Sequence, residues 1–343
     1  MKSSSTIAVI GAGLAGLSCA HALQAAGHQV TVFEKSRAAA GRMSTKRGEN
    51  SSGEAWQCDT GAQYFTARDP LFQAEVQRWQ AAGVAAEWQP KIAVFGAVPA
   101  ATQIGDTRPN IRYVGSPRMT APARYLAENL SLRTQTTVQA LRREGAAWQM
   151  RSAEHDWLNE RFDAVVLAVP APQALPLLRP VHEMLAGIAA SVRMRGSWAL
   201  MLRYSAALNL GFEAAFVNTG PLRWIAENSH KPGRSGQHCW LLHASAEWSD
   251  AHIEDSADAV ANELLAAFTE LGGPAPDAWS AHRWRYADSE KPLQLGAVWQ
   301  AADGLGLCGD WLNGGKVEGA WLSGRKLAEQ MLASSHHSCY SDT

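Results

Sequence analysis

Three glycines near the N-terminus, Gly11, Gly13 and Gly16, match the pattern G-x-G-x-x-G. Each has its own task in a dinucleotide site. The first permits a tight turn, the second lets a pyrophosphate approach the backbone, and the third lets a helix pack closely on the preceding strand. The free N–H groups at the start of that helix then face the phosphates. The spacing therefore predicts a binding site for a dinucleotide.

Glu34 lies eighteen residues after Gly16, at the place where a carboxylate accepts hydrogen bonds from ribose hydroxyls. The same negative charge repels a 2′-phosphate and disfavours NADP in this site, although Lys35 and Arg37 leave that possibility open. We expect other residues of the two loops to contact the dinucleotide as well, namely Ala12, Leu14, Ala15 and Lys35.

Two further segments carry groups suited to a flavin dinucleotide. Gly41-Arg42-Met43 follows the second predicted strand, where an arginine can face the two negative charges of a pyrophosphate. Gly309 and Asp310 follow a short apolar run and can present a carboxylate to a ribityl hydroxyl. The helix that follows Lys316–Ala320 can point its N-terminal N–H groups at N1 and O2 of a flavin, where the reduced ring is anionic.

Short apolar runs predict the elements that position these groups. Thr6–Ile10 and Gln29–Glu34 are typical of strands, and a helix over Leu14–Ala26 joins them into a β-α-β unit. Asp163–Val169 and Leu305–Cys308 are typical of buried strands. The other predicted elements are helices at Pro70–Gly83, Thr120–Leu130, Ile253–Leu271 and Gly319–Leu332, short strands between Leu132 and Leu158, strands at Ser197–Tyr204, Ala214–Asn218 and His238–Ala246, and a loop at Ser36–Ala55.

The composition excludes several classes of protein. A formal net charge of −1 argues against a nucleic-acid partner held by a general basic field. The five cysteines are odd in number and none is spaced C-x-x-C, so that neither a disulfide framework nor a metal site is predicted. No apolar run approaches the ~18 residues of a membrane span. The apolar stretch Ile7–Leu23 contains the glycine motif and is therefore not predicted to be a signal peptide, and we expect a cytoplasmic protein.

Taken together, these motifs resemble those of the FAD-dependent amine oxidase superfamily, which has a glutathione-reductase-like flavin fold. Several segments narrow the resemblance to the renalase branch of that superfamily. They are GRM at Gly41–Met43, DTGAQYFT at Asp59–Thr66, GSPRMTA at Gly115–Ala121, the WLLH run that ends at His243, and RWRY at Arg283–Tyr286.

This resemblance implies an oxidase of the 2- and 6-dihydro isomers of NAD(P)H. Its substrate would be a dihydronicotinamide dinucleotide, and electrons would pass to FAD and then to O2, which gives NAD(P)+ and hydrogen peroxide in a reaction of metabolite repair. Loss of a hydride restores aromaticity to the dihydropyridine ring, so that the site needs stacking and orientation and no general base. The sequence leaves open which isomer is preferred, whether NAD or NADP is used, and whether the protein is a monomer or a dimer.

The resemblance also implies roles for individual residues. Gln63 and Tyr64 would touch flavin and substrate, and Trp284 and Tyr286 would form an aromatic wall. His243 and Asn228 would hydrogen-bond the carboxamide or ribose of the substrate, although a purely structural role for His243 is equally open. Covalent attachment of FAD in relatives uses a cysteine that the segment from Trp311 to Gly315 lacks, and noncovalent FAD follows. Further implied cofactor contacts are Val138, Val317, Glu318 and Ala320.

The expected fold is α/β, with a glutathione-reductase-like, Rossmann-type FAD-binding domain and an interleaved α+β substrate domain built on a mixed sheet. We expect residues 1–69, 112–172 and 296–335 to form the FAD-binding domain, residues 70–111 and 173–295 to form the substrate domain, and residues 336–343 to form a tail.

Three other functions remain open from the sequence. The first is a flavin amine oxidase or a desaturase with the same fold. The second is a flavin-binding protein without turnover. The third is a dehydrogenase that binds NAD at the glycine motif, which a flavin spectrum of the purified protein would exclude.

The role of Glu34 leads to a first prediction. A hydrogen bond between a charged carboxylate and a ribose hydroxyl is worth roughly 1.5–3 kcal/mol. Replacement Glu34→Ala should therefore weaken FAD binding about tenfold or more, as measured by titration of the apoprotein with FAD. Unchanged affinity would place Glu34 outside the cofactor site.

Overall fold

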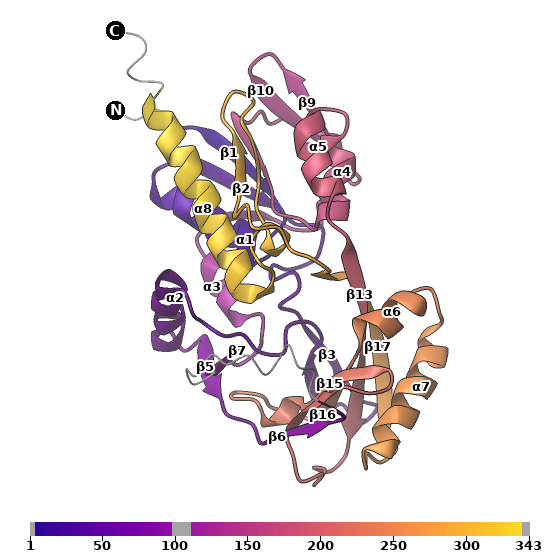
Figure 1. Ribbon diagram of the computed structural model, residues 1–343. Helices are drawn as coiled ribbons and strands as arrows, with labels where there is room; N and C mark the ends of the chain where they lie inside the picture. The colour runs from indigo at the N-terminus through magenta and orange to yellow at the C-terminus, as the bar shows by residue number, and fades with distance from the viewer. Residues whose placement is uncertain (1–3, 98–110, 338–343) are drawn as a thin grey trace.

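The computed structural model describes residues 4–97 and 111–337, and it contains two six-stranded sheets (Figure 1). The first sheet has the order β18-β19-β12-β1-β2-β8. Its five strands β1, β2, β8, β12 and β19 run parallel, and only β18 at the edge is antiparallel. Their bounds are β1 Thr6–Ile10, β2 Gln29–Phe33, β8 Ser131–Arg133, β12 Ala164–Leu167, β18 Val298–Gln300 and β19 Leu305–Leu307.

Alternate residues of β1 face opposite sides of this parallel sheet, as the two-residue period of a strand requires. Ile7 and Val9 pack with the helices α1, Leu14–Ala25, and α8, Lys316–His337. Ala8 and Ile10 pack on the other side against a three-stranded antiparallel sheet and two short helices. These elements are β9 Val138–Glu144, β10 Ala147–Ser152, β11 Asp156–Trp157, α4 Ala171–Leu178 and α5 Glu183–Ala190. The sheet is therefore buried on both faces.

The second sheet is mixed and has the order β17-β13-β16-β15-β14-β6. All its neighbours are antiparallel except β14 and β6. Apolar side chains of one face pack on the helix α7, and part of the other face packs on the strand β4, Ala55–Asp59. The elements are β6 Ile92–Phe95, β13 Met194–Tyr204, β14 Ala214–Val217, β15 Leu222–Glu227, β16 His238–Ala244, α6 Ala246–Ala251, α7 Ala257–Glu270 and β17 Ala278–Ser289.

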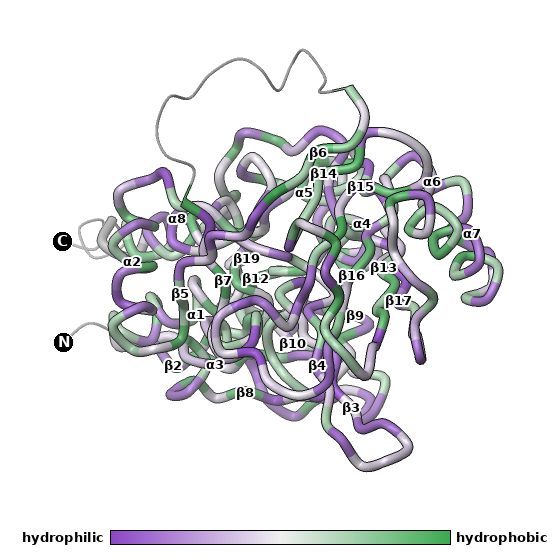
Figure 2. The backbone as a smooth tube through the Cα atoms, turned by 90° about the horizontal axis from the view of Figure 1, so that it is seen from below, coloured by the Kyte–Doolittle hydropathy of each residue, from purple (hydrophilic) through white to green (hydrophobic). Residues whose placement is uncertain are grey.

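Smaller elements connect the two sheets. A hairpin of β3, Thr45–Glu49, and β4, Ala55–Asp59, carries the chain from the parallel sheet to the mixed sheet. The other connecting elements are α2 Pro70–Ala81, β5 Ala85–Trp88, β7 Arg112–Gly115, α3 Ala121–Ala127 and the short 3-10 turns η2 Asn228–His230 and η3 Asp310–Leu312. Figure 2 shows the polar character of β3 in purple and the apolar strands β12 and β19 in green.

The structure confirms the predicted fold class and most predicted elements. Two expectations were wrong, and some elements were not predicted. Part of the predicted loop Ser36–Ala55 forms β3, whose TKRGE sequence has no apolar alternation. The predicted helix Ile253–Leu271 starts later, because Ser256 caps α7 by accepting a hydrogen bond from the N–H of Ala259. Helix α4 was not predicted, because its prolines were interpreted only as strand breakers, although the first turn of a helix tolerates proline.

The interleaving of the chain is visible in the sheets themselves. Residues 6–33, 131–133, 164–167 and 298–307 supply the parallel sheet, and residues 92–95 and 194–289 supply the mixed sheet. The exact domain boundaries stay a prediction. Residues 98–110, which belong to the expected substrate-domain segment 70–111, and most of the tail lie outside the described residues. Among the helices of the described residues, none has the length and apolar character needed to cross a bilayer.

Candidate active site

A large cleft of about 1720 Å³ lies between the parallel sheet and the mixed sheet. A site for one small molecule usually occupies ~300–1,000 Å³, so the cleft has room for a dinucleotide together with a second ligand. Its lining comes from the loops after β1 and β2, the ends of β12 and β19, the start of α8, and the strands β14 to β17. The carboxyl ends of parallel strands are the usual ligand site of such sheets.

The glycine motif forms the turn from β1 into α1 at one end of this cleft. Gly11 has φ of +106°, and a Cβ atom there would lie 2.6 Å from the carbonyl oxygen of Ala168. A Cβ atom on Gly16 would lie 2.0 Å from the carbonyl oxygen of Gly11. A Cβ atom on Gly13 would meet nothing within 4 Å, because Gly13 borders the cleft. The three glycines thus serve a turn, a packing contact and an open approach to the backbone, as predicted from their spacing.

Glu34 is almost fully buried at the end of β2 and lines the cleft. Its Oε2 accepts a hydrogen bond of 2.9 Å from the N–H of Ala12, and its Oε1 accepts one of 2.8 Å from the N–H of Ser36. The carboxylate therefore joins the glycine loop to the loop after β2. Its remaining lone pairs are the acceptors that a ribose would need.

Arg42 and Asp310 form a bidentate ion pair across the cleft. Nη1 of Arg42 donates to Oδ2 of Asp310 at 2.9 Å and to the carbonyl oxygen of Ala287 at 3.2 Å, and Nη2 donates to Oδ1 of Asp310. Burial alone would lower the pKa of Arg42, but the adjacent Asp310 carboxylate outweighs it, so the pKa is raised and the charge is retained. The two residues that were assigned separately to pyrophosphate and ribityl groups thus fix each other's orientation.

The start of α8 also borders the cleft, through Lys316, Val317, Glu318 and Ala320. Oε1 of Glu318 accepts hydrogen bonds of 2.7 Å from the backbone N–H groups of Arg68 and Asp69. Glu318 therefore ties the beginning of α2 to the beginning of α8. This carboxylate has a structural task in addition to its place in the cleft.

The mixed sheet supplies the opposite wall through residues paired across its strands. His282, Ala199, His243, Trp224 and Phe216 lie in one row across β17, β13, β16, β15 and β14. The ring centroids of Phe216 and Trp224 are 4.8 Å apart, and those of Tyr64 and Trp224 are 5.5 Å apart. All but Ala199 line the cleft. The wall is therefore largely aromatic, which suits a flat ligand.

The carbonyl oxygen of Thr60 holds two of the predicted site residues. Nε2 of His243 donates to it at 3.0 Å, and Nε1 of Trp284 donates to it at 2.8 Å. Burial, together with the positive charges of Arg223 and Lys231, lowers the pKa of His243 to about 4 despite the Thr60 hydrogen bond. His243 is therefore neutral near pH 7, with its proton on Nε2.

Beneath this wall lies a cluster of three fully buried charged side chains, Asp59, Lys231 and Arg234. Oδ2 of Asp59 accepts from Nζ of Lys231 at 3.1 Å and from Nη2 of Arg234 at 2.6 Å. Nζ of Lys231 also donates to Oε1 of Gln63 at 3.0 Å. Burial raises the pKa of Asp59, but the two cations outweigh it and the net shift is downward, whereas burial is the main cause that lowers the pKa of Lys231.

Three predicted site residues do not line the cleft. Asn228 is buried, and its amide is used by β4, since Oδ1 accepts from the N–H of Asp59 at 3.0 Å and Nδ2 donates to the carbonyl oxygen of Gln57 at 3.1 Å. This position gives no support to the predicted contact with a substrate. Ala12 and Gly16 act through loop geometry instead. All other predicted site residues border the cleft, including Val138, Met43, Gly309 and Tyr286.

Sequence reasoning missed several residues of the site. Trp224, Phe216 and His282 belong to the aromatic wall. Each has an apolar neighbour in the chain that faces the core on the other side of the sheet, and this alternation could have indicated that the three side chains face the cleft. Lys231 and Arg234 gave no signal, because only the folded chain brings them to Asp59.

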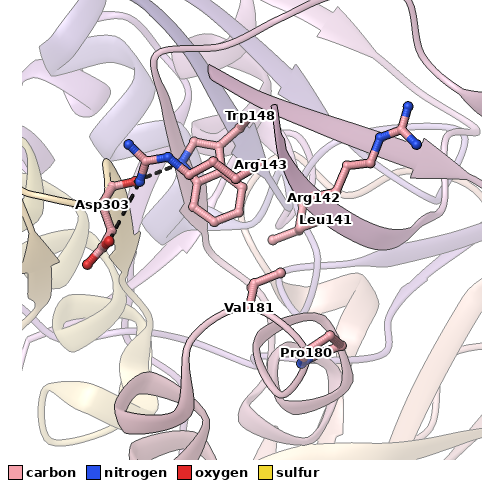
Figure 3. A pocket seen from close by; sticks show the side chains of 7 residues that line it. All are labelled: Leu141, Arg142, Arg143, Trp148, Pro180, Val181 and Asp303. Carbon is pink, nitrogen blue, oxygen red and sulfur yellow. Dashed lines mark hydrogen bonds and ion pairs between the residues drawn. The ribbon is translucent and has the colours of Figure 1, made fainter. Parts of the chain in front are cut away.

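A second, smaller pocket of about 390 Å³ lies on the far side of the parallel sheet (Figure 3). Arg143 and Trp148 both donate to the carbonyl oxygen of Asp303, at 2.7 and 2.8 Å. The N–H groups of Arg143 and Trp148 that donate these bonds are therefore already hydrogen-bonded within the protein.

Comparison with known families gives two matches. Residues 9–79 match the NAD(P)-binding Rossmann-like domain, and residues 81–332 match the flavin containing amine oxidoreductase family. The second match covers most of the chain.

Individual relatives agree with this assignment over shorter or more distant alignments. The chain is 47% identical to an L-amino acid oxidase of Bothrops pictus and 36% identical to one of Pseudechis australis, in each case over 73 residues. Those alignments cover 21% of this chain and only 14% of each relative. Among solved structures, a protein of Exiguobacterium sp. 255-15 provisionally assigned as a protoporphyrinogen oxidase has a TM-score of 0.73 at 12% identity, and putrescine oxidase bound to putrescine has 0.68 at 14%. Each alignment covers 96% of this chain and 99% of the other.

The open approach at Gly13 leads to a second prediction. The Cβ atom of a valine at position 13 meets no protein atom within 4 Å, and Gly13 borders the cleft, so we expect Gly13→Val to fold but to lose the predicted FAD. Flavin content after gel filtration, together with the melting temperature of the protein, measures both effects. Gly187→Val is the matched control, because a Cβ there also meets nothing and Gly187 lies away from the cleft. Full flavin content in Gly13→Val would contradict the assignment.

The charge cluster leads to a third prediction. Removing one partner of a buried ion pair typically costs about 3–5 kcal/mol, and we expect Asp59→Asn to lower the free energy of unfolding by that order at pH 7. Because the pKa of Asp59 is lowered in the folded state, its contribution is complete above the unfolded pKa of ~3.9 and is lost as the pH falls through the folded pKa. The difference between wild type and variant should therefore shrink below pH 4.

Urea unfolding at several pH values measures this difference. Asp258→Asn is the control, because Asp258 is exposed in the first turn of α7 and should change stability little. Equal stability of wild type and Asp59→Asn at pH 7 would show that the cluster does not depend on this carboxylate.

Proposed function

Because the chain belongs to the family of flavin-containing amine oxidoreductases, we propose that it is an FAD-dependent oxidase of the 2- and 6-dihydro isomers of NAD(P)H. The products are NAD(P)+ and, with O2 as the final acceptor, hydrogen peroxide. The family and the flavin chemistry rest on the match over residues 81–332. The choice of substrate rests on the residues of the cleft, as argued below, and on the renalase-like segments of the sequence.

FAD is the noncovalently bound cofactor of this chain. The glycine motif, Glu34 and the ion pair of Arg42 with Asp310 suit its adenosine, pyrophosphate and ribityl groups. Cys308, beside the C-terminal motif, is fully buried and does not line the cleft. When bound, FAD supplies the hydride acceptor and returns the electrons to O2.

The charge of the cleft is the observation that carries the choice of substrate. Among the described residues that line it, eight are basic and four are acidic, so that its formal charge is +4 in a chain of net charge −1. The basic residues are Lys35, Arg42, Arg68, Arg151, Arg223, Arg283, Arg285 and Lys316, and the acidic ones are Glu34, Asp288, Asp310 and Glu318.

A positive cleft attracts anions and repels cations. FAD and a nicotinamide dinucleotide both carry a pyrophosphate, and the excess of positive charge suits both together. A protonated amine would enter against this field. The cleft therefore favours a second dinucleotide over an alkyl amine as the substrate.

The residues of the wall also suit hydride loss without a base. His243 has a pKa of about 4 and donates its Nε2 proton to the Thr60 carbonyl, so it is a weak acceptor for a substrate proton near pH 7. The indole N–H of Trp284 is used by the same carbonyl, which fixes the orientation of the ring. Fixed rings orient a flat substrate, and a displacement of 1 Å can cost about a hundredfold in rate. Position over the flavin would thus decide which isomer reacts.

Oxidation of an amine is the second candidate function. The family name and the fold shared with putrescine oxidase favour it. The experiment below separates the two candidates.

Stopped-flow absorbance of the FAD-loaded protein under nitrogen supplies the fourth prediction. We expect rapid bleaching of the flavin by the 2- or the 6-dihydro isomer of NAD(P)H, and much slower bleaching by ordinary 4-dihydro NADH and by putrescine. Hydrogen peroxide released in air then shows turnover, which a non-catalytic flavoprotein lacks. Faster reduction by amines than by every dihydronicotinamide isomer would replace this function with amine oxidation.

A further inference from the structure

Arg223 occupies an irregular position in the wall of the cleft. Leu222 pairs with Ala244 and Trp224 pairs with His243, so that Arg223 is an extra residue without a partner on β16. Such a β-bulge redirects a side chain and often lies beside an active site. The side chain of Arg223 is exposed and lines the cleft next to Trp224.

Arg223 differs from three other arginines of the cleft, which are held by carboxylates. Arg42 is paired with Asp310, and both Arg283 and Arg285 contact Glu254. Arg223 makes no ion pair or hydrogen bond with any residue of ranges 4–97 and 111–337. Toward this part of the chain all five N–H donors of its guanidinium are unused, and they form the planar fork that matches a phosphate group.

The surroundings of Arg223 indicate which part of a ligand it would meet. Trp224, Phe216, Tyr64 and His243 offer rings at its side of the cleft. A flat ring that stacks among them would place its charged substituent near the guanidinium. The loop glycines and the ion pair of Arg42 lie on the parallel sheet and serve FAD, so Arg223 is left for a second anionic ligand.

We propose that Arg223 is a specificity-determining residue that binds the pyrophosphate of the dinucleotide substrate. This inference rests on the proposed function for the identity of the ring, but binding of the phosphates is a separate property that can be measured without turnover. Arg223 would thereby favour a whole dinucleotide over a bare dihydronicotinamide or an amine.

The test uses ADP-ribose, which carries the pyrophosphate but no nicotinamide ring. Its binding to the FAD-loaded protein is measured by isothermal titration calorimetry, with adenosine as the uncharged probe. We expect Arg223→Gln to weaken ADP-ribose binding about tenfold to a hundredfold, which is the usual weight of a charge-assisted hydrogen bond. Arg223→Lys should recover part of the loss, and the salt dependence of binding should be shallower in Arg223→Gln.

Arg179→Gln is the matched control, because Arg179 is an exposed arginine at the end of α4 that does not line the cleft. Flavin content and melting temperature confirm that each variant is folded. Equal binding of ADP-ribose by wild type and Arg223→Gln, or no binding by wild type, would overturn the proposal. So would an Arg223-dependent affinity for amino-acid carboxylates without one for ADP-ribose.

The two proposals fail in different ways. If ADP-ribose binding depends on Arg223 but no dihydronicotinamide isomer reduces the flavin, the phosphate site stands and the proposed reaction is wrong. If the isomers reduce the flavin equally well in Arg223→Gln and wild type at low concentration, and ADP-ribose binds both equally, the reaction stands and the role of Arg223 is wrong.

Discussion

At the end of β4, one carboxylate oxygen of Asp59 accepts hydrogen bonds from both Lys231 and Arg234, and all three side chains are excluded from water. The cluster joins the β3–β4 hairpin to the segment between β15 and β16 of the mixed sheet. Charges in such surroundings are tolerated only when they are paired. The position of β4 relative to the mixed sheet is therefore fixed by the short distances that these ion pairs require.

The geometry of the cleft follows from this position. Thr60 comes directly after Asp59, and its carbonyl oxygen orients both His243 and Trp284. Gln63 is held through Lys231 on one side and through the carbonyl oxygens of Asp59 and Gly61 on the other. The segment from Asp59 to Gln63 therefore links the position of the Asp59 carboxylate to the orientation of the side chains of His243, Trp284 and Gln63, which border the cleft. The cluster has one cation in excess, and this positive charge adds to that of the lining residues.

The sequence predicted the parts of the site that depend on neighbours in the chain. The turn at Gly11 to Gly16, the strand that ends at Glu34 and the start of α8 follow local rules of backbone conformation and hydrogen bonding, and the structure has these elements close to the expected bounds. Contacts between segments that are far apart in the chain were harder to predict from the sequence. Asn228 was assigned to a substrate, although β4 uses its amide, and the partners of Asp59 are about 170 residues away in the chain. Spacing along a chain carries no information about such contacts.

The bulge in β15 shows how a local irregularity changes the chemistry of a wall. Leu222 and Ile225 pack in the core between the mixed sheet and α7, while Trp224 and Ala226 face the other side. Counted back from Ile225 with strict alternation, Arg223 would lie opposite Ala244 and next to Leu242 and would point into that core, where an unpaired guanidinium would lose its hydration. The extra residue lets Leu222 keep its place in the core and leaves Arg223 at the cleft. In a regular strand only Trp224 would face the cleft, and Arg223 would be buried. In the bulged strand Trp224 and Arg223 both line the cleft. An aromatic ring beside an accessible cation suits a ligand in which a stacked ring carries a phosphate group.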